Sequence, residues 1–140
     1  MFDMKGFQYE ADYNYFLKKL AKGNKTIFKK KFLRLFDFRD PKLKRKEFNF
    51  IRNKIYKTLV SKYGEKCQLR LHDDCSKEMV FAVDHYIPLL SNELNKKIRK
   101  LKAEKGKKIL SQSFGSNDIS NLRIACKRCN DFKKHRIIIF

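Results

Sequence analysis

Four cysteines in two separated pairs constrain the fold of this 140-residue chain more than any other feature. Cys67 and Cys75 form the first pair of neighbours along the sequence, and Cys126 and Cys129 form the second. Paired cysteines in a chain without a secretory signal are more typical of a metal site than of disulfides. Four thiolates suit tetrahedral Zn²⁺, and a closed shell of four cysteines leaves no position for a substrate. We therefore expect a structural zinc site that joins the two pairs; the alternative is a set of unrelated, buried free thiols.

The charge of the chain narrows the choice of partners. Lys and Arg number 35 and Asp and Glu 15, so the formal net charge is +20. Such an excess is typical of proteins that bind a polyanion, most often nucleic acid. A general enrichment in lysine is the alternative, since Lys outnumbers Arg and only 5 residues are Gly. The chain has no long apolar run, either at its start or later, so we expect no membrane partner, no secretory signal and a cytoplasmic location.

Residues 1–64 show the spacing of amphipathic helices. Apolar residues recur at helical intervals in residues 8–22, 27–36 and 45–63, and Gly64 follows as a stop signal. Aromatic stripes of this kind more often build a core than bind a ligand. We therefore expect a basic, helical N-terminal part that packs on the rest of the chain, with Lys-rich outer faces that could lie on phosphates.

The composition changes in residues 65–140. β-prone runs at 79–83 and 121–125 predict two strands, and residues 126–129 turn into a final short helix. The expected fold class is therefore α+β, with the helical part packed on a strand–strand–helix unit that carries the cysteine cluster.

A basic insertion around residues 89–118 separates the two predicted strands. Residues 96–108 hold eight basic residues and one acidic residue, and the spacing of Leu94, Ile98 and Leu101 predicts a short surface helix. The apolar C-terminal end, residues 136–140, predicts a last strand or a dimer contact.

Three motifs follow one another in the second part of the chain. They are Val83-Asp84-His85-Tyr86-Ile87-Pro88-Leu89, then Asn121-Leu122, then Cys129-Asn130-Asp131-Phe132-Lys133. In their order, and in the step of nine residues from Asn121 to Asn130, these motifs resemble those of the HNH endonuclease family. The resemblance covers residues 67–134 and does not extend to residues 1–66. It implies a ββα-metal fold, metal-dependent hydrolysis of phosphodiester bonds, and DNA as the partner.

The resemblance assigns roles to four residues. His85 would be the general base, because an imidazole with a pKa near neutrality can take a proton from water. Asp84 and Asn130 would bind one divalent cation, and two oxygen ligands plus waters suit Mg²⁺, with Mn²⁺ as a substitute. Asn121 would fix the loop that carries His85. Neighbours on a strand point to opposite faces, so Asp84 and His85 can share one phosphate only if the strand ends or bulges there.

Basic residues near these motifs are candidates for phosphate contacts. Lys133 would meet a phosphate oxygen from the last helix, and His135 would either contact a phosphate or play no part. His72 would be solvated or would replace one cysteine as a zinc ligand. The full set of expected nucleic-acid-binding residues is Lys96, Lys97, Arg99, Lys100, Arg128, Lys133 and Lys134.

These patterns lead to the hypothesis of an HNH endonuclease that hydrolyses DNA with a catalytic Mg²⁺ or Mn²⁺ and a structural Zn²⁺. Two alternatives stay open. One is a zinc-stabilised nucleic-acid-binding module without activity, and the other is an RNA-cleaving nuclease of the same type. Both a monomer and a homodimer are compatible with the sequence, because one active site attacks one strand at a time.

Overall fold

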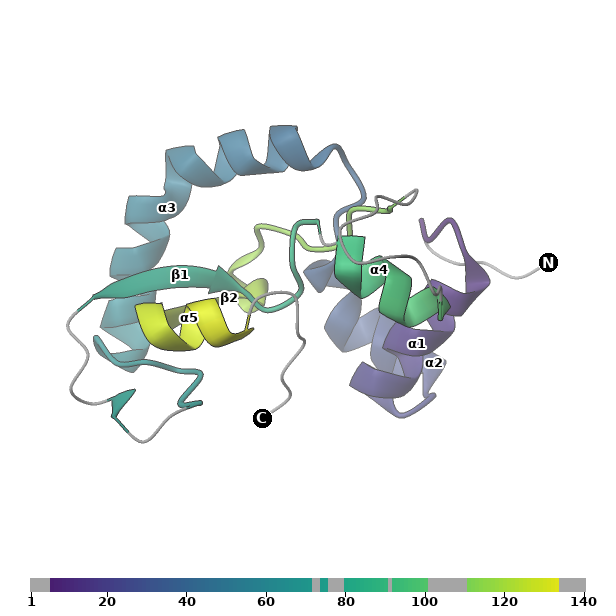
Figure 1. Ribbon diagram of the computed structural model, residues 1–140, viewed down its shortest axis with the longest axis horizontal. Coiled ribbons are helices and arrows are strands. Elements are labelled where there is room, and N and C mark those ends of the chain that lie inside the picture. The colour runs from purple at the N-terminus through teal and green to yellow at the C-terminus, as the bar shows by residue number, and fades with distance from the viewer. Residues whose placement is uncertain (1–5, 72–73, 76–79, 91, 101–110, 134–140) are drawn as a thin grey trace.

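The computed structural model describes residues 6–71, 74–75, 80–90, 92–100 and 111–133. Within these residues the chain is α+β, as expected, with helices around a two-stranded sheet. Helices α1, α2 and α4 lie together on one side, and the sheet lies with α3 and α5 on the other (Figure 1). None of the described helices is both long and apolar enough to cross a membrane.

Helix α1 (Glu10–Ala21) confirms the first predicted helix. It ends where Lys22 and Gly23 take positive φ values of 52° and 85°. The N–H of Gly23 donates to the carbonyl of Leu17 at 3.0 Å, which satisfies one of the last free carbonyls of the helix. The buried apolar face consists of Tyr13, Phe16, Leu17 and Ala21, in agreement with the sequence pattern.

The second amphipathic stretch is helical but irregular. It divides into α2 (Lys25–Ile27), a π-helical turn (Phe28–Phe32) and a 3₁₀ turn (Leu33–Leu35). The Asn24 side chain caps the start of this stretch by accepting from the N–H of Ile27 at 3.0 Å. The apolar face survives these changes in helix type, since Phe28 and Leu35 are buried.

An aromatic core joins the N-terminal helices to the basic insertion. Helix α4 (Asn92–Arg99) lies within the insertion, and its Leu94 and Ile98 are buried in this core. The ring of Phe114 packs against that of Phe16, with centroids 5.1 Å apart. Leu101 lies outside the described residues. The expected surface helix is therefore present, but one face of it belongs to a core that crosses the expected boundary after residue 64.

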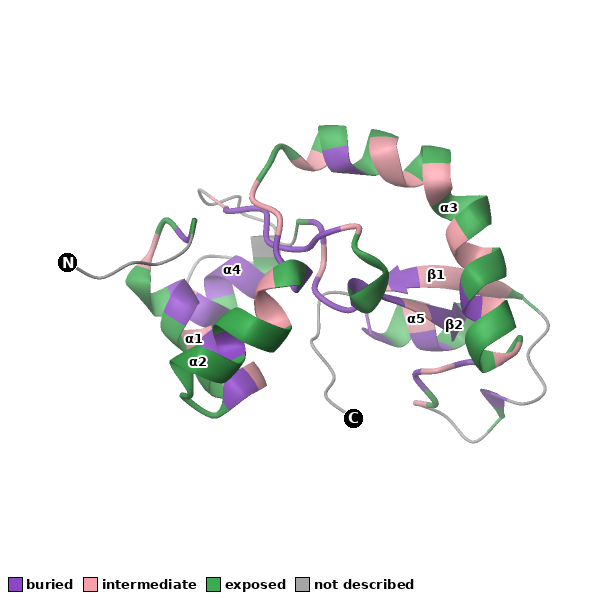
Figure 2. Cartoon of the chain, turned by 180° about the vertical axis from the view of Figure 1, so that it is seen from behind, coloured by how far each residue is buried: buried purple, intermediate pink, exposed green. Residues whose placement is uncertain are grey.

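Helix α3 (Pro41–Tyr63) begins earlier than the sequence pattern indicates. Pro41 occupies its first turn, and the Asp40 side chain caps it by accepting from the N–H of Lys42 at 2.8 Å. Gly64, with φ at 81°, ends it as predicted. Only Leu59 of the expected apolar stripe is fully buried, and much of the helix is exposed (Figure 2).

The sheet consists of β1 (Phe81–His85) and β2 (Leu122–Cys126), which pair antiparallel. Both strands lie within two residues of their predicted positions, and α5 (Lys127–Lys133) follows β2 directly. Phe81 is opposite Cys126 and His85 is opposite Leu122, so Cys126 and His85 lie at opposite ends of the sheet. Leu59 of α3 packs on Leu122 and Ile124, which places α3 on one face of the sheet.

Candidate functional site

The structure brings the four cysteines together at one end of the sheet. Their Sγ atoms all lie within 4.8 Å of one another, and all four side chains are buried free thiols. Cys126 ends β2 and Cys129 lies in α5, whereas Cys67 and Cys75 come from the segment after α3. Four Zn–S bonds of about 2.3 Å require sulfur atoms nearly 4 Å apart, roughly the size of this cluster. The cysteines are therefore not unrelated, and the cluster is compatible with a zinc ion.

Backbone N–H groups point at these sulfur atoms. The N–H of Arg70 donates to Cys67 Sγ at 3.5 Å, and that of Leu71 donates to Cys129 Sγ at 3.2 Å. Burial alone would raise the pKa of Cys67, but the surrounding backbone N–H groups outweigh it and lower that pKa to about 7. Desolvation by burial is the largest cause that raises the pKa values of Cys126 and Cys129, and hydrogen bonds with neighbouring cysteines raise them further. A cation at the centre would favour the charged thiolate forms.

A second group of residues lines an open cavity at the other end of β1. The cavity measures about 270 Å³ and is lined by Arg45, Val83, Asp84, His85, Pro88, Leu89, Leu90 and Asn130. This cavity therefore brings together Asp84 and His85, which are adjacent but point to opposite faces of the strand, and Asn130, which is distant in the sequence. A larger hollow of about 480 Å³ contains none of the motif residues.

The end of β1 resolves the conflict between the directions of Asp84 and His85. In the antiparallel register His85 shares a face with Leu122, the face that α3 covers, and Asp84 shares the opposite face with Arg123. His85 is the last residue of β1. Side chains from both faces can therefore reach a cavity that lies beyond the strand end.

Asp84 is almost completely buried, with 9% of its surface exposed. Lys133 Nζ lies 3.0 Å from its Oδ2 as an ion pair. The geometry is not that of a hydrogen bond, and within the described part of the chain this oxygen accepts none. Burial raises the pKa of Asp84, and the nearby Lys133 and Arg123 offset only part of that effect. The carboxylate is thus a buried acceptor that a further cation would stabilise.

Lys133 lies in a different environment from the one we expected. It is 1% exposed, and its Nζ donates to the carbonyl of His85 at 2.8 Å while pairing with Asp84. Burial lowers the pKa of Lys133, and the charge of Asp84 opposes this shift. In this structure Lys133 therefore balances Asp84 inside the protein and does not present its ammonium group on the surface.

The imidazole of His85 is held by Asn117. Asn117 Nδ2 donates to the carbonyl of Lys44 at 2.8 Å, which leaves its Oδ1 facing His85 Nε2, also at 2.8 Å. A carbonyl can only accept, so the amide orientation is determined and Nε2 must carry the hydrogen. Neutral His85 then has its free lone pair on Nδ1.

Several effects keep His85 neutral. Burial lowers its pKa below the usual 6.5, and the charges of Lys133 and Lys44 lower it further, against an opposite effect of the bond to Asn117. The ring of Phe48 packs edge-to-face on the imidazole, with centroids 4.6 Å apart. A neutral, oriented imidazole is what a general base needs at pH 7.

Asn121 acts on the loop after His85 and does not line the cavity. It is fully buried, and its Oδ1 accepts from the N–H of Ile87 at 2.8 Å. Its Nδ2 donates to the carbonyls of Ile87 at 3.1 Å and Ser116 at 2.8 Å. The backbone carbonyl of Asn121 accepts from the N–H of Tyr86 at 2.7 Å. One asparagine therefore connects β2 to the segment that directs the chain away from His85.

Sequence reasoning missed two residues that support this site. Asn117 is one, and Lys44 is the other. Lys44 is fully buried, and its Nζ donates to the carbonyls of Asp37 at 2.5 Å, Gly115 at 2.6 Å and Leu89 at 3.4 Å. Burial lowers its pKa to about 8. Nothing in a Lys-rich helix distinguishes this lysine from its exposed neighbours.

Gly115 allows the loops around the site to approach closely. A Cβ at this position would lie 1.9 Å from the carbonyl oxygen of Ile87, so a side chain would displace the backbone. The N–H of Gly115 donates to the carbonyl of Pro88 at 2.9 Å. The 113–117 loop, which carries Asn117, is thereby attached to the loop after His85.

The expected nucleic-acid-binding residues separate into two groups. Lys97, Lys100 and Arg128 are exposed. Lys96 is buried and pairs with Glu93 at 3.3 Å, and Arg99 pairs with the buried Asp12 at 3.2 Å. Arg99 also lies over the ring of Tyr9 at 4.0 Å. Lys96 and Arg99 thus form ion pairs within the protein. Lys134, His72 and His135 lie outside the described residues.

Comparisons with known proteins add no assignment. Scans of protein-family models, curated proteins and solved structures found no match to this chain. The argument for function therefore depends on the residues themselves.

Proposed function

We propose that the chain is an HNH-type endonuclease that hydrolyses DNA phosphodiester bonds with one divalent cation and a histidine general base. The observation that carries this proposal is the shared cavity of Asp84, His85 and Asn130 at the end of β1. Each of these residues belongs to one of the motifs that resemble the HNH family. The strand–strand–helix arrangement around them is the one that the resemblance implies.

The residues at the cavity fit a hard divalent cation. Asp84 would supply a carboxylate oxygen in competition with its ion pair to Lys133, which is 3.0 Å long, and Asn130, which lines the same cavity, would supply its amide oxygen. Two oxygen ligands and several waters are typical of Mg²⁺ and Mn²⁺. When bound, such an ion would stabilise negative charge on the phosphate and on the leaving oxygen.

The chain's own residues would prepare the water. His85 Nδ1 would accept a proton from a water at the cavity, because Nε2 is committed to Asn117. Asn121 would hold the loop after His85 in place and so keep the imidazole aimed at the cavity. The zinc-compatible cysteine cluster would fix α5 and with it Asn130.

A plasmid assay tests this proposal. Purified protein is incubated with supercoiled plasmid in the presence of Mg²⁺, in its absence, and with the variant His85→Ala as a control for contaminating nucleases. We expect conversion to nicked or linear DNA that requires both Mg²⁺ and His85. Labelled RNA in the same assay distinguishes the two substrates. Absence of metal-dependent cleavage of either would overturn the proposal.

One observation favours a second candidate, a zinc-stabilised DNA-binding module without activity. The Lys133 ammonium group already neutralises Asp84 and so competes with a metal ion for that carboxylate. Binding of DNA without cleavage in the plasmid assay would select this alternative. Replacing Lys133 with Met separates the two further, because an active site should then respond to lower Mg²⁺ concentrations.

A further inference from the structure

We propose that the side of α3 next to β1 is the surface on which the DNA backbone binds as it approaches the catalytic cavity. Two residues, Arg45 and Arg52, define this surface, which we call the arginine row. The inference rests on the proposed function, because it places the substrate of that same site. It concerns the part of the chain, residues 1–66, to which the family resemblance does not extend.

Helix α3 concentrates positive charge on its surface. Its sequence holds eight Lys and Arg residues and one acidic residue, Glu47. Seven of the eight basic residues are exposed, the exception being Lys44. Both carboxylate oxygens of Glu47 bind Arg39, at 2.9 and 2.7 Å, and Arg39 also pairs with Asp37. The helix surface therefore carries seven exposed positive charges and one carboxylate.

The arginine row lies beside the catalytic strand. Arg45 lines the cavity of Asp84, His85 and Asn130. Arg52 lines the next cavity along, of about 330 Å³, whose other walls include Phe81 and Val83 of β1. The two arginines thus follow β1 and lead to the cavity.

The spacing of the arginine row suits a nucleic-acid strand. Seven residues of α-helix span about 10.5 Å and return to within about 20° of the same face. One DNA strand carries a phosphate about every 3.4 Å along the axis, so two such arginines would span about three phosphates. Guanidinium groups bind phosphate oxygens through two parallel hydrogen bonds, which a lysine cannot do.

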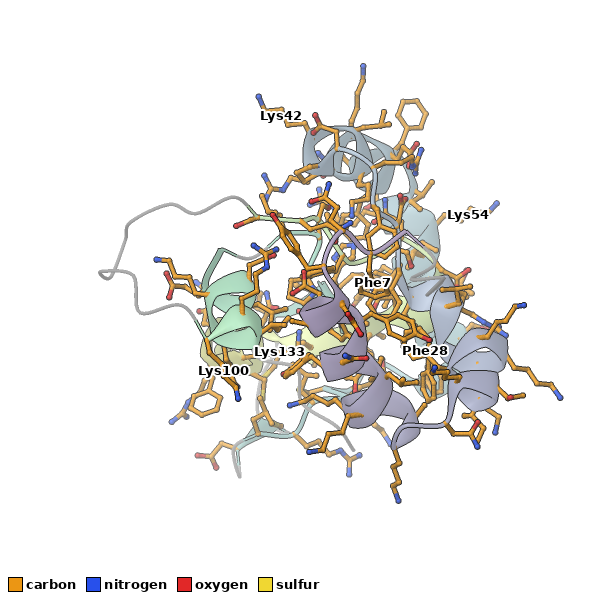
Figure 3. The ribbon with its side chains drawn as sticks, turned by 90° about the vertical axis from the view of Figure 1, so that its right-hand side faces the viewer. Phe7, Phe28, Lys42, Lys54, Lys100 and Lys133 are labelled. Carbon is orange, nitrogen blue, oxygen red and sulfur yellow. The ribbon has the colours of Figure 1, made fainter. Side chains whose placement is uncertain are left out.

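Some exposed lysines of α3 lie on its outer side. Lys42 and Lys54 project from the helix into solvent (Figure 3). On a helical wheel Lys46 and Lys57 fall on this outer side as well, away from the buried Leu59. They carry the same charge as the arginine row but are not next to β1, so they are matched controls on the same helix.

The arginine row also differs from the basic residues of α4. Arg99 and Lys96 of α4 form ion pairs with Asp12 and Glu93; Lys96 is buried, and the Arg99 side chain is 11% exposed. Within the described residues no ion pair involves Arg45 or Arg52, and both side chains are exposed. Their charge is available to a ligand.

Salt-dependent DNA binding tests the proposal without requiring cleavage. The double variant Arg45→Gln/Arg52→Gln is compared with Lys46→Gln/Lys57→Gln by fluorescence anisotropy of a labelled duplex, without added Mg²⁺. Each lost phosphate contact should reduce the slope of log K against log salt by about 0.9. We therefore expect a reduction of about 2 for the arginine row and no change for the control. The variant Arg45→Lys/Arg52→Lys should restore the slope, which excludes misfolding as the cause.

Each outcome of this measurement bears on the proposal. Equal slopes for the two Gln variants, or no measurable binding by the wild-type protein, would overturn the docking surface. Cleavage of plasmid together with equal slopes would leave the nuclease proposal standing and refute only the arginine row. A reduced slope without any cleavage would support the arginine row and refute the nuclease.

Discussion

The two ends of the small sheet carry clusters of opposite character. At the Cys126 end, four sulfur atoms lie within 4.8 Å of one another, receive backbone N–H groups and are closed to solvent. At the His85 end, an open cavity borders a buried carboxylate, a neutral imidazole and an amide. The same strands and α5 support both. The first cluster is closed and compatible with a single enclosed ion that would stabilise the fold, whereas the second is an open cavity with room for water.

The largest effect is expected at the closed end. Removing one ligand with Cys129→Ser, or removing the metal with a chelator, should unfold the sheet and α5. Zinc sites contribute about 10–16 kcal/mol of apparent free energy in small peptides, and a whole domain has only about 5–15 kcal/mol of stability. Circular dichroism and zinc content per chain measure this. A metal-free protein with an unchanged melting temperature would mean that the cysteines stabilise the fold as thiols.

The open end should tolerate substitution but lose activity. His85→Ala is expected to reduce cleavage by about 10²–10⁴-fold, the usual contribution of a general base. Zinc content and DNA affinity should remain those of the wild type, since within the described residues no hydrogen bond or ion pair joins His85 to the cysteine cluster or the arginine row. Single-turnover cleavage and anisotropy measure the two properties. Loss of zinc from this variant would show that the two ends are not independent.

A smaller effect is expected from the residue that orients the base. Asn117→Ala removes one hydrogen bond to His85 and one to the carbonyl of Lys44, and a bond of this kind is worth about 0.5–1.5 kcal/mol. Cleavage should fall by roughly 2- to 10-fold. Asn49→Ala, an exposed asparagine of α3, is the control. An unchanged cleavage rate in Asn117→Ala would mean that Phe48 and the loop after His85, rather than Asn117, orient the imidazole.

The smallest effect is a displacement of the pH profile. The pKa of His85 is lowered, so the base is neutral and competent at pH 7, and activity should fall only as the pH drops below the usual value of 6.5. Asn117→Asp places a carboxylate next to the imidazole and should raise that pKa, which moves the acidic limb to higher pH. A pH–rate profile of both proteins measures the limb. If the acidic limb of the wild-type profile had its midpoint above pH 6.5, the pKa of His85 would not be lowered, which would contradict a buried, neutral imidazole.

Local patterns were sufficient for the secondary structure near the site. The alternation and β-branched residues of β1 and β2 predicted both strands to within two residues, and Gly64 marked the end of α3. The apolar spacing placed the start of this helix at residue 45, whereas α3 begins at Pro41, after the cap residue Asp40. An Asp followed by Pro ends one helix or caps the next with the same residues, and only the hydrogen bond from the N–H of Lys42 decides between the two.

Charge was the least predictable property from the sequence. Lys133 and Lys96 carry the same side chain as exposed lysines of the chain, and Arg99 the same as the exposed Arg45, yet all three pair with acidic residues, and Lys133 and Lys96 are buried. Their partners are remote in some cases, as with Asp12 and Arg99. A residue count measures the total charge of the chain but cannot tell which charges are neutralised internally.

The sequence by itself determined which residue types are present for chemistry and in what order: two cysteine pairs, an Asp–His step, and two asparagines nine residues apart. These properties are local, because the covalent chain alone fixes the order and spacing of its residues. Only the tertiary structure decided that Asp84, His85 and Asn130 share a cavity, that Asn117 orients the imidazole, and that Lys96 and Arg99 of α4 form ion pairs while Arg45 and Arg52 of α3 form none within the described residues. Those outcomes depend on which buried groups lie next to a partner from a distant part of the chain. A buried charge or amide without a partner costs free energy, so the fold has to supply one.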